Sequence, residues 1–165
     1  MTLAIRPMTE SDRVLVVSGW SSSLRMSIYG GFISMKRWAS VMHPEINATI
    51  DHPAVSTLVA EEAGETDHLG RPFLYGFIAW SSQLIAVPYV FYVYVKKPYR
   101  LGRTKGLVQG HAAQLFAAAG IDPLKPFSYA CRTGVVAQLA RKIPLAQFAP
   151  LPGRYLALDA ALDAA

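Results

Sequence analysis

The chain has 165 residues, the size of a single domain, and we expect one domain over residues 1–165. Hydrophobic residues make up 52% of the sequence and charged residues 16%, a composition that favours a packed core and excludes intrinsic disorder. The net charge is +5, and the cations that gather between residues 96 and 142 are suited to attracting phosphate groups, on a nucleotide cofactor or on a nucleic acid.

The first elements expected are a strand at residues 3–7 and a helix at residues 14–20. Between them, Thr9 and Asp12 have the spacing of a capping box, in which each residue's side chain satisfies the other's backbone N–H. The segment 20–25, which contains Trp20 and three serines, is expected to form a loop after this helix. That loop either shapes a substrate site or is a polar connection with one anchoring tryptophan.

A second helix is expected over roughly residues 31–42. It should end before Pro44, because the residue preceding a proline is disfavoured in helical conformation. A polar stretch at 64–71 predicts a hairpin loop between two of the strands that follow. The three strands expected here, rich in β-branched and aromatic residues, lie at 56–61, 73–80 and 86–95.

The rest of the chain predicts a helix, a strand, a helix and a closing hairpin. The first of these helices has one apolar face, which includes Leu115 and Phe116, and Gly120 is expected to end it in a left-handed cap. The remaining elements are expected at 127–131, 134–142 and 146–158. This order of elements predicts an α/β or α+β layered domain.

A basic segment with a glycine joins the strand at 86–95 to the following helix. The N–H groups at a helix start form an anion site, and Gly102 would let the backbone approach a ligand closely. Arg100, Arg103 and Lys105 add positive charge to this segment. The pattern therefore predicts either a diphosphate site or a connection that only reverses the chain.

The same segment resembles the acetyl-coenzyme A (acetyl-CoA) motif of the GCN5-related N-acetyltransferases, a Gln/Arg-x-x-Gly-x-Gly/Ala sequence before an apolar helix. Tyr99, Gly102 and Thr104 occupy the motif's three positions, and Leu107-Val108 matches its apolar pair. Tyr99 and Thr104 depart from the motif. Further resemblance lies in Ile5-Arg-Pro, Glu10-Ser-Asp12, Leu58-Val-Ala-Glu61 and Tyr75-Gly-Phe-Ile78.

The resemblance implies a mixed, mostly antiparallel central sheet flanked by helices. It also implies transfer of an acetyl group from acetyl-CoA to an amine of a small molecule or a protein. The backbone at the end of the central strand would bind the cofactor's pantetheine arm and the basic segment its diphosphate. The residues expected to bind the cofactor are Tyr94, Val95, Arg100, Leu101, Gly102, Arg103, Thr104 and Lys105.

The tyrosine that this family often uses as its acid is replaced by Ala140. Tyr129 and Cys131 are therefore candidates for protonating the thiolate, although both also suit simple packing. Glu61 and Glu62 are the candidates for the base, although glutamates at the end of a hairpin also suit simple solvation, and water is an alternative proton carrier. Tyr92 and Tyr94 are expected to share one strand face, where they either line the acceptor site or pack beneath a helix.

The four histidines and Cys131 lack metal-ligand spacing, so no metal is expected. No membrane partner is expected, because the longest apolar stretch is too short to span a bilayer. The start of the chain shows no signal-peptide pattern, so we expect a cytoplasmic protein, with a homodimer left open. Two alternative functions remain: a nucleic-acid-modifying acyl transferase of the phage DNA-modification type, and a non-catalytic binding protein with the same fold.

Overall fold

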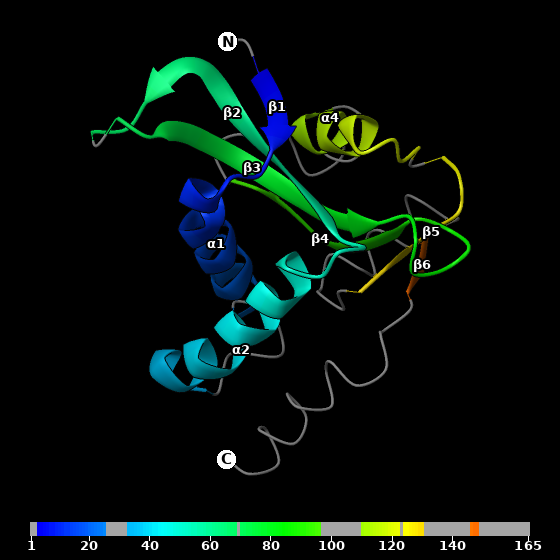
Figure 1. Ribbon diagram of the computed structural model, residues 1–165, viewed down its shortest axis with the longest axis horizontal. Coiled ribbons are helices and arrows are strands. Elements are labelled where there is room, and N and C mark those ends of the chain that lie inside the picture. The colour runs from blue at the N-terminus through cyan, green and yellow to red at the C-terminus, as the bar shows by residue number, and fades with distance from the viewer. Residues whose placement is uncertain are drawn as a thin grey trace.

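The computed structural model describes residues 3–25, 33–68, 70–96, 110–122, 124–130 and 146–148 of the chain. These segments form one sheet with helices on both of its faces (Figure 1). In order across the sheet, the strands are β1 (Leu3–Pro7), β2 (Ser56–Thr66), β3 (Pro72–Ser81), β4 (Tyr89–Val95), β5 (Phe127–Tyr129) and β6 (Ala146–Phe148). The helical elements are η1 (Glu10–Asp12), α1 (Arg13–Arg25), α2 (Met35–Ile50) and α4 (His111–Ala118).

The sheet is antiparallel from β1 to β4 and parallel from β4 to β6. Figure 1 shows α1 and α2 on one face of the sheet and α4 on the other. The chain passes through α4 between β4 and β5, the kind of helical crossover that a parallel pair of strands requires. The predicted layered fold, a mixed and mostly antiparallel sheet flanked by helices, is confirmed.

Each face of the sheet has its own apolar core. On the face covered by α1 and α2, the buried side chains include Val16, Trp20, Trp38, Ile46, Phe77 and Phe91. On the face covered by α4, they include Ile78, Val90, Val95, Leu115, Phe116 and Phe127. Residues of one strand therefore contribute alternately to two separate cores, as expected for a sheet that is covered on both sides.

The predicted capping box precedes α1. The carboxylate of Asp12 accepts hydrogen bonds from both the backbone N–H and the hydroxyl group of Thr9, each at 2.8 Å. The helix itself is longer than predicted, because Ser21–Arg25 continue it instead of forming a loop. Trp20 and Leu24 are buried against the sheet, and this packing holds the serine-rich segment in helical conformation.

The predicted end of the second helix before Pro44 is wrong, since α2 passes through Pro44 and ends at Ile50. The buried side chains of α2 are Trp38, Met42, Ile46, Thr49 and Ile50, which repeat at helical spacing on both sides of the proline. Pro44 has no backbone N–H, so the carbonyl group of Ser40 lacks its usual hydrogen-bond donor in the helix. Both residues are on the exposed side of α2. Water can therefore hydrate that carbonyl, and packing of the opposite face keeps the helix continuous.

The strands β2 and β3 are also longer than predicted. Gly64, which the sequence predicts to be in the hairpin loop, lies in β2 with a φ of 85°. It is next to a shift in the register of β2 and β3, between Glu61 and Thr66. The loop itself is shorter, and Arg71 closes it by hydrogen-bonding Asp67 (2.7 Å). The strand at 86–95 is confirmed as β4, which begins at Tyr89.

The predicted left-handed cap at Gly120 is confirmed by a φ of 70°. The backbone N–H of Ile121 donates to the carbonyl of Phe116 (2.9 Å), the six-to-one hydrogen bond of a Schellman motif. The strand expected at 127–131 is present as β5. The predicted helix at 134–142 and the predicted turn at Pro152-Gly153 lie outside the described residues.

Candidate active site

The strands β4 and β5 are paired over only a short length in the described part of the chain. The pairs are Tyr89 with Ser128 and Val90 with Tyr129, and the N–H of Ala130 donates to the carbonyl of Val90 (2.9 Å). Strand β4 then continues for five residues to Val95. A β-bulge lies at the point where this pairing ends, because Trp80 pairs with Val90 and Ala79 with Tyr92, which leaves Phe91 as an extra residue.

Beyond the bulge, the backbone groups of β4 point to defined sides. The N–H of Lys96 donates to the carbonyl of Tyr75 on β3 (2.7 Å). Since successive residues of a strand direct their N–H and C=O groups to opposite edges, those of Tyr94 face β3 and those of Val93 and Val95 face away from it. Of the two residues expected to bind the cofactor through their backbone, Val95 therefore has the better-directed groups.

Tyr129, a candidate acid, lies beside the end of the pairing between β4 and β5. Its side chain is on the α4 face, in the same apolar cluster as Val90 and Val95. Only 7% of Tyr129 is exposed, and this burial raises the pKa of its phenol above the ordinary value. The phenol therefore keeps its proton at neutral pH, which is the state needed for a proton donor.

The bulge places Phe91 and Tyr92 on the same face of the sheet, toward α1. The rings of Tyr92 and Trp20 stack with their centroids 5.1 Å apart, and Tyr94 packs against Phe77 at 5.5 Å. The expected common face of Tyr92 and Tyr94 is confirmed. Both rings pack beneath α1, one of the two arrangements left open by the sequence.

The hydroxyl group of Tyr92 also hydrogen-bonds the hydroxyl of Ser23 on α1. The hydroxyl oxygen of Ser23 lies 2.8 Å from the carbonyl oxygen of Gly19. A carbonyl oxygen can only accept a hydrogen bond. The single proton of Ser23 is therefore directed to Gly19, and Tyr92 is the donor to Ser23. This interaction ties the bulged part of β4 to α1.

Glu61, a candidate base, belongs to an ion-pair network near the hairpin end of β2 and β3. The guanidinium of Arg6 donates to Glu61 at 2.8 Å and to Asp12 at 2.6 Å. The hydrogen bond with Asp12 is the main cause of a raised pKa of Arg6. Burial acts to raise the pKa of Asp12, but hydrogen bonds from Arg6 and Thr9 together lower it below its ordinary value. The network joins β1, β2 and η1.

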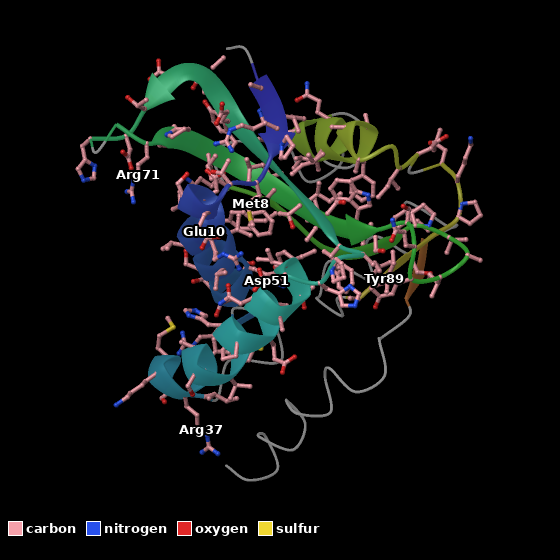
Figure 2. All side chains as sticks on the ribbon, in the orientation of Figure 1. Met8, Glu10, Arg37, Asp51, Arg71 and Tyr89 are labelled. Atoms are coloured by element: carbon pink, nitrogen blue, oxygen red, sulfur yellow. The ribbon has the colours of Figure 1, made fainter. Side chains whose placement is uncertain are left out.

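The structure does not bring Glu61 and Tyr129 together. Glu61 pairs with Leu74 toward the hairpin end of β3, whereas Tyr129 pairs with Val90, which lies beside Trp80 near the other end. The two residues are three strands apart, roughly 14 Å across the sheet. They are also six residues apart along β3, which is roughly 20 Å along the strands. Figure 2 shows Arg71, at the hairpin tip, and Tyr89, at the start of β4, toward opposite ends of the sheet. Glu61 is therefore placed to stabilise the fold, and we assign it no proton-transfer step.

The remaining sequence-predicted site residues, Cys131 and the series Arg100, Leu101, Gly102, Arg103, Thr104 and Lys105, lie outside the described residues. The residues that flank this series carry a feature that the sequence reasoning missed. Lys96 places its ammonium group 4.3 Å from the centre of the Phe73 ring, and its burial lowers the pKa of that ammonium group. Lys96 and Phe73 lie far apart in the sequence, so this contact has no local sequence signal.

Among the described residues, no three His, Cys, Asp or Glu side chains are grouped as metal ligands would be. None of their helices is both long enough and apolar enough to cross a membrane.

No protein-family model matches the sequence, and no curated protein matches it either. Solved structures do match the fold. A predicted acetyltransferase with acetyl-CoA from Clostridium acetobutylicum superposes with a TM-score of 0.52 and 14% identity, covering 86% of this chain and 88% of that one. The chain has an acetyltransferase fold. A histone acetyltransferase HPA2 and related acetyltransferase from Corynebacterium glutamicum gives a TM-score of 0.50 at 14% identity, covering 86% and 83% of the two chains.

This acetyltransferase fold is the one that the resemblance implied, so that expectation is confirmed at the level of the fold. The identity of 14% is too low to carry residue roles from those proteins to this one. The positions of Val95, Tyr129 and the β4 bulge are the features of this chain that bear on its function.

Proposed function

We propose that this protein is an acetyl-CoA-dependent N-acetyltransferase that transfers an acetyl group to an amine of a small molecule or a protein. The observation that carries the proposal is the geometry of β4 within an acetyltransferase fold. The strand bulges at Phe91, where its described pairing with β5 ends, and then runs on to Val95. The bulge directs the backbone groups of Val93 and Val95 away from β3, toward the side on which we propose that an extended, amide-containing ligand lies.

The described residues fit the pantetheine arm of acetyl-CoA, which contains two amide groups. The N–H and C=O of Val95 point away from β3, and apolar side chains of the α4-face core lie beside them. We propose that the diphosphate binds to Arg100, Leu101, Gly102, Arg103, Thr104 and Lys105. The ammonium group of Lys96, which lies a few residues before that segment in the sequence, adds positive charge on the same side of it.

Bound acetyl-CoA would supply an activated thioester, and the protein must then manage two protons. The amine has to lose one before it attacks, and the departing thiolate has to gain one. We propose that Tyr129 gives its phenolic proton to the thiolate, with Cys131 as the alternative donor. Even from a phenol of ordinary pKa, about 10, to a thiol of pKa about 8.5, the equilibrium cost of this transfer is about 2 kcal/mol, and the raised pKa of Tyr129 increases that cost. Water is the proposed acceptor for the proton of the amine.

Isothermal titration calorimetry with acetyl-CoA tests the cofactor part of the proposal, with the same titration of the Gly102→Trp variant as a control. We expect binding by the wild-type protein and its loss in the variant, because an indole side chain would fill the space that the diphosphate needs. Release of free coenzyme A thiol with a panel of small amines and lysine peptides then tests the reaction. Absence of binding at millimolar acetyl-CoA would overturn the proposal.

A further inference from the structure

Strand β3 contains a second irregularity, at Tyr75. On β2, Ala60 pairs with Gly76 and Glu61 pairs with Leu74, so that Tyr75 is an extra residue in β3. Such a bulge changes the direction in which side chains leave the strand. Only 1% of Tyr75 is exposed, so its ring is a fixed support for the side chains that pack against it.

Phe73 and Lys96 are both placed by this part of β3. The ring of Phe73 packs edge-on against the ring of Tyr75, with 5.6 Å between the centroids. The ammonium nitrogen of Lys96 lies 4.3 Å from the centre of the Phe73 ring. The backbone N–H of Lys96 also donates to the carbonyl of Tyr75 at 2.7 Å. The contact between the amine and the ring is therefore fixed at both of its ends.

Among the described residues, no carboxylate is paired with the ammonium group of Lys96. The ion pairs of this part of the chain all have an arginine as their cation, which is Arg6, Arg13 or Arg71. The titratable groups around Tyr75 are Glu62, whose carboxylate accepts the tyrosine hydroxyl, and His111, whose ring lies 6.0 Å from that of Tyr75. Neither of them belongs to those ion pairs.

The surroundings of Lys96 favour the neutral form of its amine. The residue is half-buried, and an aromatic ring covers the ammonium group without supplying a full counter-charge. Burial accordingly lowers the pKa of this ammonium group, although the ring face itself attracts a cation. A lysine in such a position is more often neutral than one in water, and the neutral amine is the nucleophile.

We propose that Lys96 is an acylation site of this protein, where the side-chain amine takes an acyl group from a thioester such as acetyl-CoA. The inference goes beyond the proposed function, because the amine belongs to the protein itself and the reaction needs only a thioester that reaches it. Acylation would replace the ammonium group by a neutral amide. It would therefore remove one positive charge and the cation–π contact at the end of β4.

The reaction is balanced without a further reactant. The neutral Nζ of Lys96 attacks the carbonyl carbon of the thioester, so that a C–N bond forms and the C–S bond breaks. The sulfur leaves as a thiolate and takes up the proton that the nitrogen releases. The products are an amide on Lys96 and a free thiol.

The test compares Lys96 with two exposed lysines of the same chain, Lys36 on α2 and Lys125 just before β5. The protein is incubated with N,S-diacetylcysteamine, a small thioester that lacks the nucleotide of coenzyme A. Peptide mass spectrometry then gives the rate of acetylation at each lysine. At about pH 7.5 we expect Lys96 to react about threefold faster or more. This advantage should shrink toward about pH 10.4, where an ordinary lysine amine is half neutral.

Two substitutions of Phe73 test the cause of the reactivity. Phe73→Ala admits water around the amine, so the rate at Lys96 should fall to about the rate at the exposed lysines. Phe73→Leu keeps most of the apolar cover but removes the ring face that favours the ammonium form, so the advantage should persist or increase. Circular dichroism shows whether each variant is folded, and the rates at Lys36 and Lys125 should be the same in all the proteins.

Faster acetylation of Lys96 that is lost in folded Phe73→Ala supports the proposal. Repeating the assay with acetyl-CoA identifies the donor. Selective acetylation by both thioesters supports direct reaction from solution, and selectivity with acetyl-CoA alone supports transfer from a bound molecule. Equal rates at the three lysines with both thioesters overturn the proposal, as does an advantage of Lys96 that persists in Phe73→Ala. Calorimetry with acetyl-CoA tests the proposed function separately, so either can fail while the other stands.

Discussion

Gly76 on β3 pairs with Val95 on β4, and the two backbones are so close that no side chain fits between them. A Cβ atom at Gly76 would overlap the carbonyl oxygen of Tyr94 and would lie 3.2 Å from the Cα of Val95. Both obstacles are backbone atoms, which cannot rotate away as a flexible side chain can. Glycine at this position therefore sets how closely β3 approaches the end of β4.

We expect Gly76→Ala to destabilise the protein by about 3 kcal/mol, the upper end of the usual cost of overpacking. The measurement is the midpoint of urea unfolding. Gly19→Ala on α1 is the matched control, because a Cβ there would make ordinary contacts with ring atoms of Phe77, at 3.4 Å, and of Tyr94, at 3.7 Å. Alanine is also preferred to glycine in a helix by about 1 kcal/mol, so the control should be neutral or stabilising. Equal midpoints for the two variants would contradict this account of Gly76.

Pro44→Ala should stabilise the protein, since Pro44 removes one backbone hydrogen bond from the interior of α2. We expect a gain of about 1–2 kcal/mol, smaller than the full helical penalty of proline because proline also restricts the unfolded chain. The melting temperature should then rise by roughly 2–4 °C for each kcal/mol. A lower melting temperature would show that Pro44 contributes packing that its exposure does not reveal.

The difference between the predicted and observed end of α2 shows where sequence reasoning is limited. Patterns that involve only neighbouring residues predict the structure correctly at two places. These are the capping box at Thr9 and Asp12 and the left-handed cap at Gly120. Pro44 is also a local signal, but it is outweighed by the burial of Trp38, Met42 and Ile46 against the rest of the fold. Whether a helix continues through a proline depends on that packing, which a single sequence does not display.

The candidate site shows the same limit. The order of elements and the resemblance to an acetyltransferase motif indicated β4 and the residues around Val95. The partner of Glu61 is Arg6, which lies 55 positions away in the sequence, so an apparently solvated glutamate could not be recognised as a member of an ion-pair network. The two bulges, at Phe91 and Tyr75, depend on the register between strands and were equally hidden.

Asp12→Asn should weaken the network around Arg6 and change how stability depends on pH. Because the folded protein lowers the pKa of Asp12, the carboxylate adds stability above the unfolded-state pKa of about 3.9, and this contribution is lost as the pH falls through the folded-state value. At pH 7 the free energy of unfolding of the variant should be lower by about 2 kcal/mol, the cost of weakened hydrogen bonds to a charged group. The difference in the free energy of unfolding between the wild-type protein and the variant, measured by urea unfolding, should become smaller below pH 4. A difference that stays constant down to pH 2 would show that ionisation of Asp12 is not the cause.

Tyr129→Phe tests the proposed acid without removing the buried ring. If the phenol protonates the departing thiolate, kcat should fall by about 10²-fold, the lower end of the usual contribution of a general acid. The KM for acetyl-CoA should stay the same, since the apolar contacts of the ring with Phe127 and its neighbours are retained.

Because burial raises the pKa of Tyr129 above 10.0, this residue should cause no decline in wild-type activity below pH 10. The assay is thiol release across pH 6 to 10, with acetyl-CoA binding measured in parallel. An unchanged kcat with intact binding would transfer the role of acid to Cys131 or to water, because the substitution removes the only proton that this side chain can donate.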